Sequence, residues 1–401
     1  MIPKPFENIV HSDVAALIDN EVGERRTLEY KEQLPGNSES DKKEFLADIS
    51  SFANAGGGDV LYGVKEKRDA AGRPTGIAEA APGLDGINCD GAIQRLENMI
   101  RDGIEPRIPG IRIKAVEGFA EGPVIVVRVS RSWALPHMVR NSSRFYSRNS
   151  SGKYPLDVQE IRSAFAASDA TPERIRRLRD ERLSTIIADE TPVRLDEGAR
   201  IVLHVLPLAA LDRTLRGDST SKPLEWPDLR PIGANGLNLK NNFDGIVSTS
   251  SRSVSTVAYA YCQLFRSGLI ESVRVVEFLK GGASKRHIEL PRYEIMLVSA
   301  LDTYLKTQTK LGLDPPWIIL LSLLHVKGQI LSSGRNPDVA DASQEFDRDS
   351  LLLPDVLVEQ GHPPASNLLR ESFQMIWQAA GFPESQSHNY SKDGDWTRPQ
   401  Q

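Results

Sequence analysis

Hydrophobic residues in the first 165 positions follow two alternating spacings. Between residues 41 and 58 they recur every three or four positions, at Phe45, Ile49, Phe52 and Ala53. This spacing predicts an amphipathic helix with one buried face, which the glycines at its end terminate. Further helices are predicted on the same basis at residues 11–20 and 90–102, and strands on shorter apolar runs at residues 27–33, 59–64, 110–118 and 122–132.

The second half of the chain shows strands first and helices later. Apolar, strand-like runs begin at residue 201, and a long helical pattern covers residues 292–312. A helix rich in arginine is predicted to begin near Thr171, because Pro172 then takes the favoured first helical position. Residues 190–199 contain Pro and Gly with little apolar periodicity, which indicates a linker.

These patterns predict an α+β fold with two domains, which also suits a chain of 401 residues. The first domain is predicted to have a mixed sheet, the second has no assigned role, and the polar, aperiodic C-terminus is predicted to fray. The predicted parts are the first domain at residues 1–168, a basic helix and linker at 169–199, the second domain at 200–382 and the tail at 383–401.

Composition is typical of a soluble globular protein. Hydrophobic residues make up 40% of the chain and charged residues 26%, which is ordinary for folded domains. Cys89 and Cys262 stand far apart without CxxC spacing, so neither a disulfide framework nor a cysteine zinc site is expected, and the predicted location is cytoplasmic. The N-terminus lacks a signal-peptide pattern, and the most apolar window, from Trp317, is shorter than the ~20 residues of a membrane span.

Two glutamates and a lysine stand close together near the N-terminus. The five-residue spacing of Glu24 and Glu29 does not place both on one face of a helix. Carboxylates on a strand edge and its preceding turn can converge on a hard cation, Mg²⁺ or Mn²⁺, with Lys31 stabilising a phosphate oxygen. The alternative is a charged turn beside Arg25 and Arg26, followed by an exposed strand.

A basic stretch indicates a nucleic-acid partner. Between Arg131 and Arg182 there are eleven Arg or Lys against six Asp or Glu, although the whole chain carries a net charge of −5. Aromatic residues alternate with these cations, a composition that suits contacts with phosphates and stacked bases. The candidate contacts are His137, Arg140, Arg144, Arg148 and Lys153. A solvated helix explains the arginines of residues 174–182 as well, and a structural role competes with a functional one for His137.

Three segments resemble, in this order, the AlbA-type domain of the Schlafen family. They are "GERRTLEYK" at residues 23–31, "FLADISSFANAGGGDVLYGV" at 45–64 and "PHMVRNSSRFYSRNSSGKYPLDVQEIRSAF" at 136–165. The resemblance implies an AlbA-like, nucleic-acid-binding fold for this part of the chain. Schlafen proteins that cleave tRNA have a three-carboxylate site, and the resemblance implies that its first two members match Glu24 and Glu29.

The third carboxylate of that site departs from the family pattern. Gly56 occupies the position where the resemblance implies an aspartate. Asp59, three residues later, can replace it only if the glycine turn brings Asp59 round to the site. The predicted catalytic group is therefore Glu24, Glu29, Lys31 and Asp59, with Glu24 and Glu29 as the metal ligands.

The leading prediction is a nucleic-acid-binding protein that acts as a metal-dependent endoribonuclease on structured RNA such as tRNA, with Mg²⁺ or Mn²⁺ as cofactor. The alternatives are a non-catalytic DNA- or RNA-binding regulator and an assembly component of a bacterial defence or stress system. One AlbA-type lobe offers a duplex only one basic wall, so a homodimer or a larger even-numbered homo-oligomer is predicted. A monomer whose second domain forms the other wall is the alternative to that assembly.

Overall fold

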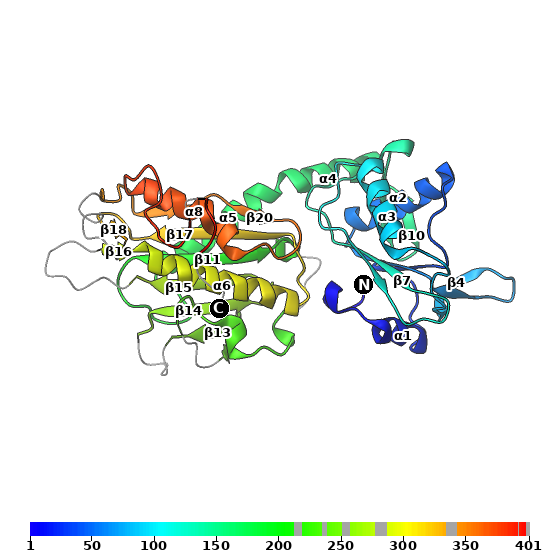
Figure 1. Ribbon diagram of the computed structural model, residues 1–401, viewed down its shortest axis with the longest axis horizontal. Helices are drawn as coiled ribbons and strands as arrows, with labels where there is room; N and C mark the ends of the chain where they lie inside the picture. Colours follow the sequence, from blue (N-terminus) through cyan, green and yellow to red (C-terminus); the bar gives the residue numbers. More distant parts are fainter. Residues whose placement is uncertain are drawn as a thin grey trace. The chain divides into compact units, whose positions relative to one another are not determined.

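The computed structural model describes residues 1–211, 219–234, 239–250, 257–276, 287–333, 343–391 and 393–397. The chain forms two compact units, Met1–Ile175 and Arg176–Gln401 (Figure 1). Each unit combines helices with sheets, which confirms the predicted α+β fold class. No helix in the described part of the chain is long and apolar enough to cross a membrane.

The first unit is built on a four-stranded mixed sheet in the order β1-β2-β7-β6. Its strands are β1 (Leu28–Lys31), β2 (Gly58–Tyr62), β6 (Arg112–Val116) and β7 (Val124–Val129). β1 runs parallel to β2, and the other neighbouring strands are antiparallel. The mixed sheet predicted from the sequence is therefore present.

Helices cover both faces of this sheet, with α2 and α3 on one side and α1 on the other (Figure 1). Their bounds are α1 (His11–Asp19), α2 (Glu39–Asn54) and α3 (Cys89–Gly103). α2 begins where the Ser38 hydroxyl accepts a hydrogen bond from the Asp41 amide at 3.1 Å. Phe45, Ile49 and Phe52 lie in the core on the α2 side, as the three- and four-residue spacing predicted.

A second, antiparallel sheet packs against α2 through β9. Its strands are β5 (Ile104–Glu105), β8 (Met138–Val139), β9 (Arg144–Asn149) and β10 (Gly152–Pro155), in the order β10-β9-β8-β5. The remaining elements of the unit are the hairpin β3 (Lys65–Arg68) and β4 (Pro74–Ala80), the 3₁₀ turns η1 (Phe6–Asn8) and η2 (Arg140–Ser142), and α4 (Val158–Asp169).

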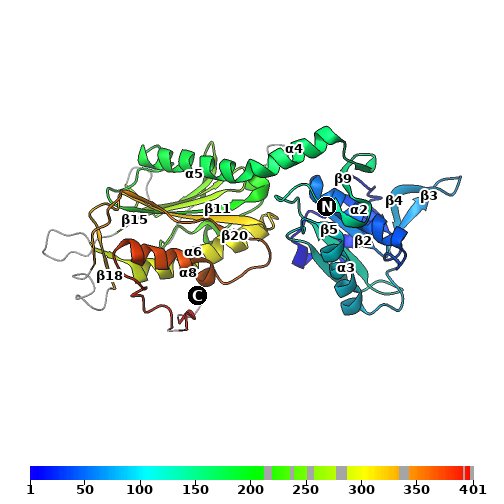
Figure 2. The same ribbon diagram turned by 90° about the horizontal axis from the view of Figure 1, so that it is seen from above.

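The second unit has one large sheet with helices on both faces. In Figure 2, α6 (Leu290–Lys310) and α8 (Ala365–Ala379) lie on one face, and α5 (Thr171–Ile187) lies on the other. The strand order is β12-β13-β14-β15-β11-β17-β19, with β20 also paired to β17. These strands are β11 (Arg200–Pro207), β12 (Leu239–Asn241), β13 (Gly245–Thr249), β14 (Ala260–Phe265), β15 (Ile270–Val275), β17 (Trp317–Leu324), β19 (Ser350–Leu352) and β20 (Val356–Val358).

The smaller elements of the second unit lie around this sheet. β16 (His287–Glu289) and β18 (Ile330–Ser332) form a two-stranded parallel sheet of their own. The 3₁₀ turns are η3 (Leu208–Leu211), η5 (Ser219–Ser221) and η6 (Trp226–Leu229). α5 crosses the division of the chain, because its first residues belong to the first unit and the rest belong to the second.

Two segments differ from the sequence predictions. Residues 190–199, predicted as a linker, pack on the second unit, where Leu195 is buried and pairs with Ala258. The tail predicted to fray is anchored through its described part, because Asn389 is fully buried. The amide of Asn389 donates to Glu294 of α6 at 2.8 Å. Hydrogen bonds to buried partners therefore fix the C-terminal segment in place, although its sequence lacks the apolar periodicity that predicts ordered structure.

Two arginines of α5 differ from the solvated helix face that their pattern allowed, whereas Arg174, Arg176 and Arg177 are exposed. Arg179 is buried and donates to the Leu321 carbonyl at 2.6 Å and to Ser322. Arg182 forms two hydrogen bonds with the buried carboxylate of Glu271, at 2.8 and 3.0 Å. These two arginines hold the helix on its sheet and are not available to a phosphate backbone.

Candidate functional site

Glu29 of β1 is the centre of a buried group of charges on the α2 side of the sheet. One carboxylate oxygen accepts a hydrogen bond from the Lys31 ammonium at 2.7 Å, and the other forms an ion pair with Arg148 of β9. Burial alone would raise the pKa of Glu29, but the two cations outweigh burial and hold the pKa below its ordinary value. Glu29 is therefore a charged carboxylate whose two oxygens already have partners.

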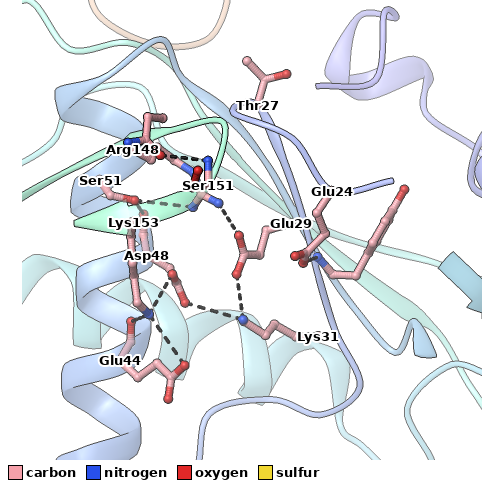
Figure 3. Close-up of polar contacts among 12 residues, drawn as sticks. Glu24, Thr27, Glu29, Lys31, Glu44, Asp48, Ser51, Arg148, Ser151 and Lys153 are labelled. Atoms are coloured by element: carbon pink, nitrogen blue, oxygen red, sulfur yellow. Dashed lines mark hydrogen bonds and ion pairs between the residues drawn. The ribbon is translucent and has the colours of Figure 1, made fainter. Parts of the chain in front are cut away.

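Asp48 of α2 extends this group of charges across the helix (Figure 3). The Lys153 ammonium lies 2.9 Å from one oxygen of Asp48, and the Lys31 ammonium lies 3.9 Å from the other. Lys153 also lies 3.6 Å from Glu44 at the solvent side. Burial raises the pKa of the Asp48 carboxyl against the opposing effect of Lys153. Lys31 thus links the strand carboxylate of Glu29 to the helix carboxylate of Asp48, and Lys153 joins Asp48 to Glu44.

Arg148 is held from three sides. Its guanidinium stands 3.9 Å from the centre of the Phe52 ring and 3.4 Å from the Ser51 hydroxyl, in addition to the ion pair with Glu29. Only 4% of Arg148 is exposed. The side chain therefore joins β9 to β1 and α2, and we call Glu29, Lys31, Asp48, Arg148 and Lys153 the charge network.

Glu24 lies in the turn before β1, beside the charge network. Its carboxylate accepts a hydrogen bond from the Tyr30 amide at 2.8 Å. Burial, together with repulsion from Glu29, raises the pKa of Glu24 to about 7. Glu24 is thus close enough to Glu29 for the two charges to interact, and it titrates near neutral pH.

Asp59 does not join these carboxylates, which corrects its prediction as the third catalytic group. In the paired register of β1 and β2, Asp59 is opposite Leu28 and therefore faces away from Glu29. Arg128 donates to both oxygens of Asp59 at 2.7 and 2.9 Å, and the Ile2 amide donates to one of them at 2.6 Å. Asp59 is a fully buried partner of Arg128.

The carboxylates on the α2 side do not fit Mg²⁺ or Mn²⁺ in this arrangement. A hard cation needs free oxygen ligands at ~2.0 to 2.6 Å, whereas both oxygens of Glu29 are occupied by Lys31 and Arg148. Across the described ranges, no group of three or more His, Cys, Asp or Glu side chains is placed to hold a metal ion. A metal ion bound by Glu24 and Glu29 would have to compete with Lys31 or Arg148 for an oxygen of Glu29.

The residues predicted to bind nucleic acid are dispersed. Arg144 is exposed, and Arg140 is exposed but forms an ion pair with Glu105 at 3.3 Å. Arg148 and Lys153 belong to the charge network instead of a free loop.

His137 is fully buried, and its ring nitrogen Nδ1 lies 2.7 Å from the Pro106 carbonyl. Burial lowers the pKa of His137 to about 4, so the ring is neutral at pH 7. This position does not fit a contact with nucleic acid.

Three arginines gather instead at one end of the central sheet. Arg26 precedes β1 and Arg131 follows β7, and the strand directions put both at the same end of β2. Ser168 of α4 donates to the Trp133 carbonyl at 2.9 Å, which brings the start of α5 and Arg174 to this end. Burial lowers the pKa of Arg131, and the like charges of Arg26 and Arg174 lower it further. We call Arg26, Arg131 and Arg174 the arginine cluster.

Sequence reasoning missed Asp48 and Asn54. A signal for Asp48 was present, because an aspartate inside the buried helical run from Phe45 to Ala53 requires a cationic partner. Asn54 accepts a hydrogen bond from the His137 amide at 2.7 Å, and its own amide donates to the carbonyls of His137 and Tyr146. It fixes the second sheet to the end of α2, and nothing in the sequence marked that role.

Comparison with known families agrees with this fold. Residues 24–157 match the family model described as Schlafen, AlbA_2. The first unit therefore contains a Schlafen AlbA-type domain, as the sequence resemblance predicted. A domain of this type indicates nucleic-acid binding and does not by itself establish endoribonuclease activity.

Comparison with individual proteins adds little. The crystal structure of the DIP2311 protein from Corynebacterium diphtheriae is similar to part of this chain, with 18% identity and a TM-score of 0.23. The match covers 36% of this chain and 29% of the DIP2311 chain, and likeness at this level carries no argument about function. No curated protein matches the chain.

Proposed function

We propose that the first unit binds nucleic acid through phosphate contacts made at the arginine cluster. The observation that carries the proposal is the convergence of Arg26, Arg131 and Arg174 at one sheet end, where burial and the charges of Arg26 and Arg174 lower the pKa of Arg131. A phosphate backbone relieves such repulsion, because its anions lie at regular intervals along the strand. The Schlafen AlbA-type domain over residues 24–157 supports the same partner.

Two members of the arginine cluster are suited to an external ligand. Arg26 and Arg174 are exposed, and neither forms an ion pair with any residue that the structure describes. This separates them from Arg148, whose guanidinium is committed to Glu29. Exposed, unpaired arginines can donate two parallel hydrogen bonds to a phosphate without first breaking a contact inside the protein.

Replacing Arg26 and Arg174 with glutamine tests this proposal. The double variant should lose affinity for single-stranded RNA and for duplex DNA alike, and the slope of log affinity against log salt should fall by about one for each lost contact. Arg73→Gln is the matched control, because Arg73 is also exposed but pairs with Asp69 at the far hairpin. Equal affinity and equal salt slope for the double variant and the control would reject the arginine cluster as the binding surface.

A metal-dependent endoribonuclease, with structured RNA such as tRNA as substrate, is the second candidate. One observation favours it: Glu24 and Glu29 interact closely enough that their repulsion contributes to a pKa of about 7 for Glu24. Binding ranks above catalysis because Lys31 and Arg148 already neutralise Glu29. Catalysis would need a second arrangement in which at least one of these cations releases its oxygen of Glu29 to the metal ion.

Incubation of the full chain with tRNA and Mn²⁺, with and without chelator, tests the second candidate. Cleavage that needs the metal and is lost in Glu24→Gln and Glu29→Gln variants would establish the nuclease. Intact tRNA, together with salt-dependent binding, would leave a non-catalytic DNA- or RNA-binding regulator. If the protein instead has an assembly role in a defence or stress system, the tRNA should stay intact and the binding assay should show no binding.

The proposed binding mode keeps the prediction of a homodimer or larger even-numbered assembly. A single arginine cluster offers one contact region, and a twofold axis would supply a second copy of it. Light scattering of the full chain at micromolar concentration measures the assembly directly. A mass near 44 kDa with full nucleic-acid binding would contradict it, since one chain has a mass of 44.3 kDa.

A further inference from the structure

A pocket of about 550 Å³ lies between α2, α3 and η2, away from the charge network. Its size is within the range of about 300–1,000 Å³ that is typical of small-molecule sites. The two helices approach closely at its base, where a Cβ on Gly103 would come within 2.4 Å of Leu46. All of its lining residues belong to the first unit.

The base of this pocket is apolar and its α3 wall carries amides. Leu46 of α2 and Met99 of α3 supply the apolar surface. Gln94 and Asn98 are four residues apart and so lie on the same face of α3. Neither amide side chain forms a hydrogen bond with any residue in the described part of the chain, and Asn98 is half-buried. A half-buried amide without protein partners leaves donors and an acceptor for a ligand.

Charges line the pocket in near balance with a small positive excess. Lys42 pairs with Glu39 at 2.9 Å and Arg140 pairs with Glu105 at 3.3 Å, so Arg95 is the lining cation without a carboxylate partner among the described residues. Arg95 is positioned by a hydrogen bond from its guanidinium to the Pro35 carbonyl at 2.8 Å. A ligand with one anionic group would therefore be favoured over a neutral or cationic one.

We propose that this pocket takes the base of a nucleotide, with its flat face on Leu46 and Met99 and its polar edge on Gln94 and Asn98. A nucleobase combines an apolar face with in-plane donors and acceptors, which is what this surface matches. The thioether of Met99 is polarisable and packs well against rings. The attached phosphate lies at Arg95, the lining cation that has no carboxylate partner among the described residues. Where the nucleotide is part of a strand, this inference rests on the proposed function.

The two sources of the base, a free nucleotide and an unpaired position of a strand, are distinguished by calorimetry. The full chain is titrated with AMP, CMP, GMP and UMP, and separately with a single-stranded oligonucleotide and the same sequence as a duplex. The test variant is Gln94→Met with Asn98→Leu, which removes the amides and keeps the size of both side chains. Glu97→Gln is the matched control, because Glu97 is exposed on α3 and does not line the pocket.

The expected result is at least a tenfold loss of affinity in the test variant for a mononucleotide or for the single strand, with Glu97→Gln unchanged. Loss for mononucleotides alone identifies a free nucleotide as the ligand, and loss for the single strand but not the duplex identifies an unpaired base. No binding of any mononucleotide, together with equal single-strand affinity in the test variant and wild type, overturns the inference. Thermal unfolding checks that both variants are folded.

These outcomes separate this inference from the proposed function. If the pocket binds no base but the arginine cluster binds phosphate, the double variant Arg26→Gln with Arg174→Gln still has a lower affinity for duplex DNA than wild type. If the proposed function fails, that double variant changes nothing, while loss of mononucleotide binding in the amide variant still supports the pocket.

Discussion

Arg148 of β9 forms its ion pair with Glu29 of β1 across 119 positions of the chain, with the guanidinium packed on Phe52. A strand that the sequence marked as a basic loop therefore supplies a buried counter-ion. The pair fixes the second sheet against the first, and it decides whether Glu29 is free for a ligand.

Arg148→Met should destabilise the protein by about 3–5 kcal/mol, because it leaves a buried carboxylate with one of its two cations missing. The methionine keeps most of the apolar contact with Phe52, so the loss reports mainly on charge. Chemical denaturation at pH 7 measures it. Arg144→Met on the same strand is the control, since Arg144 is exposed and has no ion pair in the described residues; its effect should stay within about 0.5 kcal/mol. Similar losses in both variants would contradict a buried ion pair.

Glu24 should make stability depend on pH between about 4.5 and 7. Its pKa is raised from 4.5 to about 7 in the folded chain. A raised pKa gives stability that is fully present below pH 4.5 and is lost as the pH rises through 7. Glu24→Gln is neutral throughout, so its stability relative to wild type should increase from pH 4.5 to pH 8. Urea denaturation at several pH values measures this difference, and parallel curves for the two proteins would show that Glu24 titrates normally.

Asp59→Asn should reduce stability by about 3–5 kcal/mol, because Arg128 would keep a buried charge without its carboxylate. Per folded molecule, nucleic-acid binding should not change, since Asp59 faces away from Glu29. Thermal unfolding and binding below the transition measure the two effects. Asp85→Asn, at an exposed position, is the control. If the variant lost nucleic-acid binding or any tRNA cleavage but kept its stability, Asp59 would be a functional residue, as the sequence predicted.

Residue spacing predicted the helices and strands well, but it predicted the contacts of the charged side chains poorly. The helix from Glu39 to Asn54 could be predicted, because Phe45, Ile49 and Phe52 repeat with the period of a helix. The side of the sheet on which Asp59 lies could not be predicted. β2 is buried on both sides, so its sequence shows no alternation of apolar and polar residues.

The candidate site was predictable only in part for the same reason. Glu24 and Glu29 are near in sequence, and their proximity followed from local pattern. The partners of Glu29 depend on how β9 packs on α2, which brings together residues about a hundred positions apart. Local charge counting therefore assigned Arg148 and Lys153 to a free surface, whereas Arg148 is buried against Glu29 and the half-buried Lys153 is paired with Asp48.

The C-terminal segment should contribute to the stability of the second unit through Asn389. Its amide donates to Glu294 at 2.8 Å and to the Pro291 carbonyl at 2.7 Å, and Trp377 donates to the same glutamate at 3.3 Å. Burial raises the pKa of Glu294 despite these donors. Asn389→Ala should cost about 1–3 kcal/mol, because it leaves buried acceptors without a partner.

Loss of the Asn389 donor should raise the pKa of Glu294 further. A raised pKa removes stability as the pH increases, so the cost of Asn389→Ala should be larger at pH 8 than at pH 5. Denaturation of the full chain at both pH values measures it, with Gln386→Ala as the control at an exposed position of the same segment. An equal and small effect of both variants at both pH values would mean that the segment adds no stability to the folded state. That result would support the sequence-based prediction of a frayed C-terminus.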